Sequence, residues 1–164
     1  PTGERNYTAT DSNTQGSPFA SISKAAAPSA ATIGEVVTYT VDVTIPPGTI
    51  MYDATVIDTL PVGLAYDGMV SSSCDMEGST CNPMITATDV GVVGSQAVGF
   101  WLGDLVPASA TGEERVVTIT YEAHVLPILG RGDTPYNSAS IWGNNTLSTV
   151  FSVANLQIRY NCMT

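Results

Sequence analysis

Positive charge is scarce in this sequence of 164 residues. Lys and Arg together number 5, Asp and Glu number 15, and the formal net charge is -10. A protein that binds nucleic acid needs a basic surface that releases counterions from the phosphates, and anionic membranes also attract basic surfaces. The composition therefore argues against nucleic acid and against an anionic membrane as partners.

Long apolar runs are absent as well. A membrane-spanning helix needs roughly 20 consecutive apolar residues, and no stretch of this sequence reaches that length. Only 12% of the residues are charged, so Thr, Ser, Asn and the carboxylates must keep the surface soluble. Such a surface is typical of secreted proteins, and we expect an extracellular location on the cell surface.

Motifs for catalysis and metal binding are also missing. The single histidine, His124, lies in a strand-like segment without neighbouring metal ligands, and neither a Gly-x-Ser-x-Gly motif nor a phosphate-binding loop occurs. We therefore predict a protein that is not an enzyme, apart from any single reaction on itself, and that needs no metal or cofactor.

The sequence contains only 3 cysteines. Cys74 and Cys81 flank a short polar segment, CDMEGSTC, and are close enough for a local disulfide in an oxidising compartment. Cys162 has no obvious mate near the end of the sequence. We predict a disulfide between Cys74 and Cys81.

Alternation of apolar and polar residues, the period of a β-strand, dominates the sequence from Phe19 onward. Turn-forming Pro and Gly separate the alternating runs. Pro28 interrupts the Ala-rich stretch Ala25–Ala31, which we interpret as a connecting loop. The last run, Leu147–Tyr160, is interpreted as one long strand. The predicted strands are FASISK, GEVVTYTVDVTI, YDATVIDTL, MITATDV, QAVGFWLGDL, RVVTITYEAHVL, NSASIW and LSTVFSVANLQIRY.

This pattern predicts an all-β fold, an immunoglobulin-like antiparallel β-sandwich of about 7–10 strands. The length fits one domain, which we place at residues 19–164. Residues 1–18 are polar and form an N-terminal tail. That tail is either a strand exchanged with a neighbouring subunit or the last strand of a preceding repeat.

Three polar residues lie on apolar strand faces. Alternation places Lys24, Asp58 and Asn137 on the same faces as apolar neighbours. Lys24 is also the only lysine of the sequence. A buried lysine is unfavourable unless it is paired or neutral, so its position requires an explanation.

Two interpretations of these residues remain open. In the first, Lys24 lies near a strand end, extends its ammonium group to water and pairs with Asp58, while Asn137 satisfies a turn. In the second, a neutral Lys24 amine attacks the Asn137 carboxamide and expels ammonia, with Asp58 carrying the protons. Burial favours the second, because it stabilises the neutral forms of both ionisable groups.

The stretches ISKAAAPSAATIGEVVTYTVDVTIPPG and YDATVIDTLPVGLAYDG resemble the immunoglobulin-like conserved repeat of bacterial and archaeal surface proteins, the domain of unknown function eleven. They are also similar to the isopeptide-forming domain of Gram-positive fimbrial subunits. The shared features are a lysine on a strand, a Gly-acid-x-Val-x-Tyr-Thr strand, an Asp-Thr-Leu-Pro-x-Gly-Leu turn and a late Asn-x-Ala strand.

The resemblance spans roughly Ile22 to Ile141 and implies both a fold and a reaction. In the isopeptide-forming relatives, a lysine, a mid-domain acid and a late asparagine react, and these fall on Lys24, Asp58 and Asn137. The cysteine segment and the long final strand depart from the family pattern. The resemblance thus implies an immunoglobulin-like fold with a Lys24–Asn137 isopeptide bond.

We expect a structural building block of an extracellular assembly, either a filament subunit or an adhesin stalk repeat, whose partners are copies of itself or adjacent repeats. The alternative is an adhesin module that binds a host, matrix or carbohydrate ligand. Arg131, Gly132 and Asp133 spell the integrin-binding tripeptide in a predicted loop. Trp101 or Trp142 would suit a sugar if exposed, although core packing is the commoner role for a strand tryptophan such as Trp101.

Overall fold

The computed structural model describes residues 20–74, 84–88, 96–105, 114–144 and 150–159. The predicted N-terminal tail, Cys81 and Cys162 lie outside these residues. The described residues form strands and turns without a helix, so no helix among them could cross a membrane.

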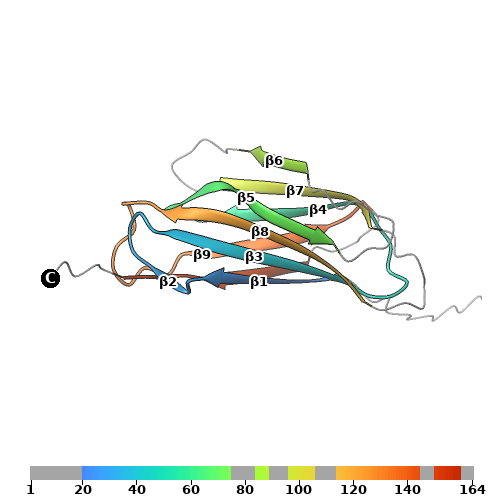
Figure 1. The fold of residues 1–164 in the computed structure, drawn as a ribbon, viewed down its shortest axis with the longest axis horizontal. Coiled ribbons are helices and arrows are strands. Elements are labelled where there is room, and N and C mark those ends of the chain that lie inside the picture. The colour runs from blue at the N-terminus through green and yellow to red at the C-terminus, as the bar shows by residue number, and fades with distance from the viewer. Residues whose placement is uncertain (1–19, 75–83, 89–95, 106–113, 145–149, 160–164) are drawn as a thin grey trace, which may run out of the picture.

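Two antiparallel sheets form the body of the domain (Figure 1). The four-stranded sheet has the order β1-β3-β8-β5, and the five-stranded sheet has the order β10-β9-β4-β7-β6. The strands of the first are β1 (Ser21–Ala27), β3 (Val36–Ile45), β5 (Leu64–Cys74) and β8 (Arg115–Val125). Those of the second are β4 (Met51–Leu60), β6 (Met84–Thr88), β7 (Gln96–Leu105), β9 (Tyr136–Trp142) and β10 (Val150–Asn155).

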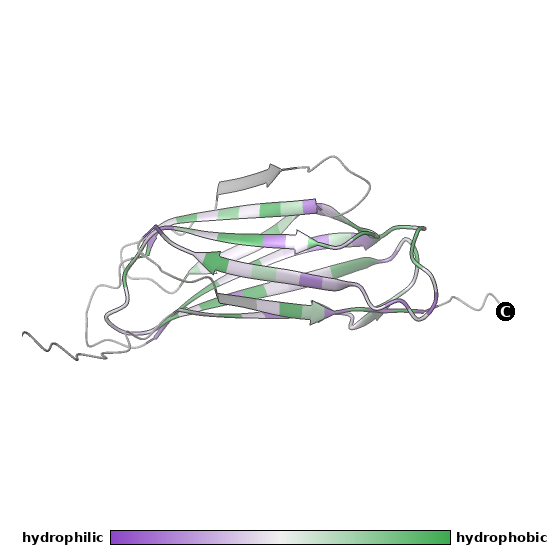
Figure 2. Cartoon of the chain, turned by 180° about the vertical axis from the view of Figure 1, so that it is seen from behind, coloured by the Kyte–Doolittle hydropathy of each residue, from purple (hydrophilic) through white to green (hydrophobic). Residues whose placement is uncertain are grey.

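The core lies between the two sheets and follows directly from the alternation in sequence. In β3, Tyr39, Val41 and Val43 are buried, whereas the intervening Thr40 and Asp42 are only half-buried. Apolar and polar bands alternate along the strands in Figure 2. Removing one apolar face of each sheet from water supplies the main driving force for folding. The predicted class, an all-β immunoglobulin-like sandwich, is confirmed.

Two details of the predicted strands are wrong. The Ala-rich stretch is not a loop, because β1 continues to Ala27 and Ala30–Ala31 forms the short strand β2. The last run is not one strand, because it divides into β10 and β11 (Gln157–Ile158), and β11 pairs in parallel with β2. The two sheets of the sandwich hold nine strands, which agrees with the predicted 7–10, and β2 and β11 form a separate two-stranded sheet.

Strand β5 was absent from the sequence prediction. It lacks clean alternation because two register shifts, at Tyr66/Gly68 and Met69/Ser71, interrupt its pairing with β8. Gly68 adopts φ +146, a conformation open to glycine and strained for other residues. A bulged strand at the edge of a sheet gives little periodic signal.

Trp101 is not a core residue, contrary to the commoner role of a strand tryptophan. Its side chain belongs to the outer face of the five-stranded sheet, because its neighbours Phe100 and Leu102 are the buried ones. Trp142 is likewise exposed next to the buried Ile141. Both tryptophans of the chain are therefore surface residues.

The chain enters and leaves the described domain at opposite ends. Ser21, which begins β1, pairs with Thr44 near one end of the sandwich, and Ile158 pairs with Ala31 near the other end. In Figure 1 the long axis of the molecule runs between these two ends, roughly along the strands.

Candidate cross-linking site

Lys24, Asp58 and Asn137 meet between the two sheets. Lys24 comes from β1 of the four-stranded sheet, whereas Asp58 and Asn137 come from the neighbouring strands β4 and β9 of the five-stranded sheet. The side chains of Lys24 and Asp58 have no exposed surface, and Asn137 is fully buried. All three side chains therefore face the core, as the alternation of the sequence predicts.

One hydroxyl group joins the lysine and the asparagine. Lys24 Nζ donates a hydrogen bond to Tyr121 Oη at 2.9 Å, and Asn137 Nδ2 donates to the same oxygen at 2.7 Å. Lys24 Nζ also donates to Asp58 Oδ2. The amine and the carboxamide nitrogen therefore lie within two hydrogen-bond lengths of each other, with the carboxylate against the amine.

Two buried oxygens in this cluster have no hydrogen-bond partner among the described residues: Asp58 Oδ1 and Asn137 Oδ1. A buried acceptor without a donor costs about 1–3 kcal/mol. A proton on the Asp58 carboxyl would turn an unpaired acceptor into a donor. Such a donor would be satisfied only by an acceptor within reach, and Asn137 Oδ1 is the other unpartnered acceptor of the cluster.

Burial shifts both ionisable groups toward their neutral forms. It lowers the pKa of Lys24 from 10.5 to about 8, and the nearby Asp58 charge opposes this shift only in part. It raises the pKa of Asp58 above its ordinary value, against the opposing effect of the Lys24 charge. Burial therefore brings the pKa values of the amine and the carboxyl closer together, which lowers the cost of proton transfer between them.

Aromatic rings from both sheets pack around the cluster. Lys24 Nζ lies 5.0 Å from the ring centroid of Tyr39 and 5.4 Å from that of Tyr121. The two rings stack at 5.3 Å, and Phe100 stacks on Tyr121 at 5.8 Å. These rings exclude water and hold the amine in place.

The interpretation in which Lys24 extends to water is wrong, because its side chain is fully buried. Asn137 does not satisfy a turn, because its side-chain amide donates to Tyr121. Sequence reasoning missed Tyr121 as a member of the site. Alternation placed it on the inward face of β8 among apolar residues, where a tyrosine looks like an ordinary core residue.

The predicted disulfide is only partly described. Cys74 is disulfide-bonded, and its pairing with Cys81 stays a prediction because Cys81 lies outside the described residues. No group of three or more metal-ligating side chains occurs among the residues that the structure describes.

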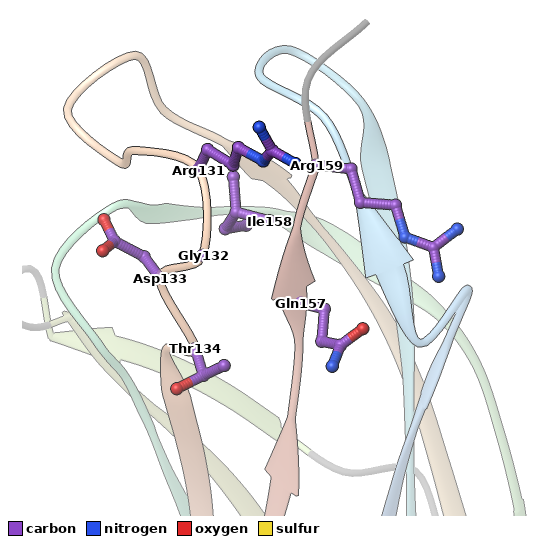
Figure 3. Close-up of a pocket in the computed structure, with 7 residues that line it drawn as sticks. All are labelled: Arg131, Gly132, Asp133, Thr134, Gln157, Ile158 and Arg159. Atoms are coloured by element: carbon purple, nitrogen blue, oxygen red, sulfur yellow. The ribbon is translucent and has the colours of Figure 1, made fainter.

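The Arg131–Asp133 loop lines a pocket of about 440 Å³ beside β11 (Figure 3). The loop is tied to the last strand, because Gly132 N–H donates to Ile158 O and Ile158 N–H donates to Asp133 O. Asp133 Oδ2 accepts a hydrogen bond from Gly130 N–H at 2.7 Å. The Arg131 and Asp133 side chains point away from each other in Figure 3. Integrin-type recognition by this loop stays a prediction.

No protein-family model and no curated protein matches the chain. Its likeness to the domain of unknown function eleven therefore stays a prediction.

Several solved structures have a similar fold. The major pilin RrgB of Streptococcus pneumoniae aligns with 80% of this chain at 18% identity and a TM-score of 0.56. The major pilin BcpA of Bacillus cereus aligns with 85% at 17% identity and a TM-score of 0.53. A C-terminal fragment of the major pilin GBS80 of Streptococcus agalactiae aligns with 87% at 12% identity and a TM-score of 0.56.

The aligned region is only part of each of these proteins. It covers 24% of the RrgB chain, 40% of the BcpA chain and 56% of the GBS80 fragment. At such low identity the likeness establishes the fold, an immunoglobulin-like sandwich of the kind found in pilins.

Proposed function

We propose that this chain is a structural module of an extracellular filament or stalk, whose two sheets are joined by an isopeptide bond between Lys24 and Asn137. The observation that carries the proposal is the buried cluster in which an amine, a carboxyl group and a carboxamide meet around Tyr121 Oη. A cluster of this kind costs stability if it remains unreacted, because it buries a charged pair and leaves two acceptors unsatisfied.

The reaction begins with proton transfer from the Lys24 ammonium to Asp58, which gives a neutral amine and a carboxylic acid. The amine attacks Asn137 Cγ, and the protonated Asp58 donates a hydrogen bond to Asn137 Oδ1 as negative charge develops there. The Nζ–Cγ bond forms and the Cγ–Nδ2 bond breaks. Asp58 passes one proton from Nζ to Nδ2, which leaves as ammonia, so that atoms and charges balance without a co-reactant.

Tyr121 positions the two reacting groups. Its hydroxyl oxygen accepts hydrogen bonds from both nitrogens before the reaction. Burial raises the pKa of Tyr121 well above its ordinary value, so its hydroxyl group stays neutral and does not compete with Asp58 as a proton carrier. Holding both reactants in one geometry removes much of the entropic cost of bringing them together.

The bond would connect the two sheets across the core. Lys24 lies on β1 of one sheet and Asn137 on β9 of the other, so the bond closes a loop that contains most of the domain. By the chain-entropy model used for disulfides, a loop of roughly 100 residues gives about 4 to 5 kcal/mol of stabilisation.

The direction of the chain suits a module that carries tension. The described chain starts at one end of the long axis and finishes at the other, so a pulling force acts along the strands. A covalent link between β1 and β9 bears that force before the sheets separate. The pilin folds of the similar structures support a filament role with copies of the same chain, or adjacent repeats, as partners.

Intact-mass measurement tests the proposal. The purified chain should weigh one ammonia less than its sequence mass under reducing conditions. Asn137→Ala should show the full mass of its own sequence, whereas Asn155→Ala, at an exposed asparagine of the adjacent strand β10, should still lose ammonia. A full sequence mass for the folded wild-type chain would contradict the cross-link and leave only the scaffold role.

A further inference from the structure

The two tryptophans of the chain lie close together on the outer face of the five-stranded sheet. Trp101 of β7 and Trp142 of β9 both pair with Thr55 of β4, one on each side. The exposed fractions of the two residues are 39% and 36%. With strands spaced about 4.8 Å apart, the two tryptophan backbones are separated by about 10 Å. Two large aromatic side chains thus flank one small residue on a solvent-facing surface.

The ring of Trp101 is held in place. A Cβ at Gly103, two residues further along the strand, would lie 3.8 Å from a ring carbon of Trp101, so the ring lies over the glycine. The indole Nε1–H donates a hydrogen bond to Asp53 Oδ1 at 3.2 Å. A ring that is already fixed loses little entropy when a ligand binds on it.

Hydrogen-bonding groups stand beside the rings. Asp53 lies at a register shift of β4 with φ 51, and its Oδ2 accepts a hydrogen bond from Asn144 Nδ2 at 2.7 Å. Asn144 follows Trp142 by two residues, and Asp104 accepts a hydrogen bond from the Asp53 backbone N–H. The carboxylate and amide groups therefore form a polar rim at the same end of the sheet as the rings.

The charge of this face restricts its ligand. None of the five strands of the sheet contains Lys, Arg or His, and the nearby charges, Asp53 and Asp104, are negative. An anionic ligand would be repelled. Thr55, between the rings, is small, and the half-buried Ile57 lies next along β4 between Gly99 and Ser140, so a flat ligand can lie across the strands.

We propose that Trp101 and Trp142 form a platform that binds a neutral, extended polysaccharide. A sugar ring has an apolar C–H face that stacks on an indole and a rim of hydroxyl groups that needs hydrogen bonds, and this surface offers both. Two sugars of one chain stack on the two rings, and Asp53 and Asn144 bond their hydroxyl groups. The platform is independent of the cross-link, which lies on the other face of the sheet.

Binding of cellohexaose and chitohexaose to the full chain, followed by calorimetry and tryptophan fluorescence, tests the platform. At least one of these neutral sugars should bind and change the fluorescence, whereas anionic polygalacturonate should not bind. Trp101→Ala and Trp142→Ala should each weaken binding by about three- to tenfold, and the double variant should not bind measurably.

Matched variants separate stacking from folding. Trp142→Tyr keeps a ring and should bind more tightly than Trp142→Ala. Tyr136→Ala removes an aromatic residue that is 65% exposed at the opposite end of β9, and should bind like the wild type. A urea unfolding transition like that of the wild type would show that each variant has folded. The proposal is overturned if neither neutral sugar binds, if the double variant binds like the wild type, or if the tryptophans instead mediate self-association seen in sedimentation.

Discussion

Lys24 and Asn137 come from opposite sheets and donate hydrogen bonds to the same oxygen, Tyr121 Oη, at 2.9 and 2.7 Å. The tyrosine thereby fixes the distance between amine and amide through a third strand, β8. Because these residues are far apart in sequence, their meeting depends on correct pairing of both sheets. The cross-link can form only after the sandwich has folded.

Tyr121→Phe should slow cross-linking without preventing folding. The change removes the acceptor that positions both nitrogens, and one N–H group of each nitrogen loses its hydrogen-bond partner, at a cost of about 1–3 kcal/mol. The fraction of chains that have lost ammonia, followed by mass over time after refolding, measures the effect.

Tyr39→Phe is the matched control for this prediction. The Tyr39 ring packs on Tyr121 at 5.3 Å and lies 5.0 Å from the amine, but its hydroxyl group does not bridge the two nitrogens, because Lys24 Nζ donates to Tyr121 Oη and Asp58 Oδ2 instead. The Tyr39→Phe variant should therefore form the cross-link nearly as fast as the wild type. Equal rates for both tyrosine variants would contradict a positioning role for Tyr121 Oη.

Asp58→Asn should abolish cross-linking and destabilise the fold. The variant keeps the shape of the side chain but cannot carry protons, and it leaves the buried Lys24 without its countercharge. Removing one partner of a buried pair typically costs about 3–5 kcal/mol. Urea unfolding measures the loss, and Asp58→Asn combined with Lys24→Met should recover part of it because no buried charge remains.

Stability of the unreacted fold should rise between about pH 8 and pH 10. In Asn137→Ala the bond cannot form, and Lys24 titrates near 8 when folded but near 10.5 when unfolded. Within this window the unfolded chain binds more protons, so the free energy of unfolding increases with pH, by up to about 3 kcal/mol. Below pH 8, Lys24 is protonated in both the folded and the unfolded chain, so its contribution to the free energy of unfolding does not change with pH.

Lys24→Met in the Asn137→Ala background should lack this increase, and urea unfolding at pH 8 and pH 10 compares the two. The window closes near pH 10 because burial raises the pKa of Tyr39 to about 12. Above pH 10 the unfolded tyrosine loses its proton first, and stability falls again. A parallel pH dependence in both variants would show that Lys24 is not the titrating group.

The wild-type chain should be more stable than Asn137→Ala by about 4 to 5 kcal/mol from the bond, plus the cost of the cavity that the substitution leaves in the variant. Asn137→Asp provides a second unreacted reference of the same size if it fails to cross-link. Urea unfolding of both proteins gives the comparison. Reducing conditions are used so that the disulfide of Cys74 is absent from both proteins. Equal stability of cross-linked and unreacted chains would contradict a stabilising role for the bond.

Alkylation without reduction should label Cys162 and leave Cys74 and Cys81 unmodified. After reduction all three should react, and the intact mass should first increase by two hydrogens. Cys81→Ser should free Cys74 for labelling if the two are partners. Labelling of Cys81 in the unreduced wild-type chain would show that Cys74 pairs elsewhere.

Alternation along the strands predicted much of the fold, because each sheet buries one face. The same alternation placed Lys24, Asp58 and Asn137 inside, and their polarity on apolar faces made them visible as a group. Tyr121 carried no such signal, because a tyrosine is common in a core. Strand β5 was missed because its bulges disrupt the period of two. Trp101 was expected in the core but is exposed, because alternation does not show which face of a sheet is covered.

Tandem mass spectrometry of a protease digest tests the central claim most directly. It should yield a branched peptide in which the Lys24 side chain is attached to Asn137, with ammonia lost at that junction and both residues absent from linear peptides. Recovery of Lys24 and Asn137 only in separate linear peptides, or loss of ammonia at another asparagine, would contradict the account.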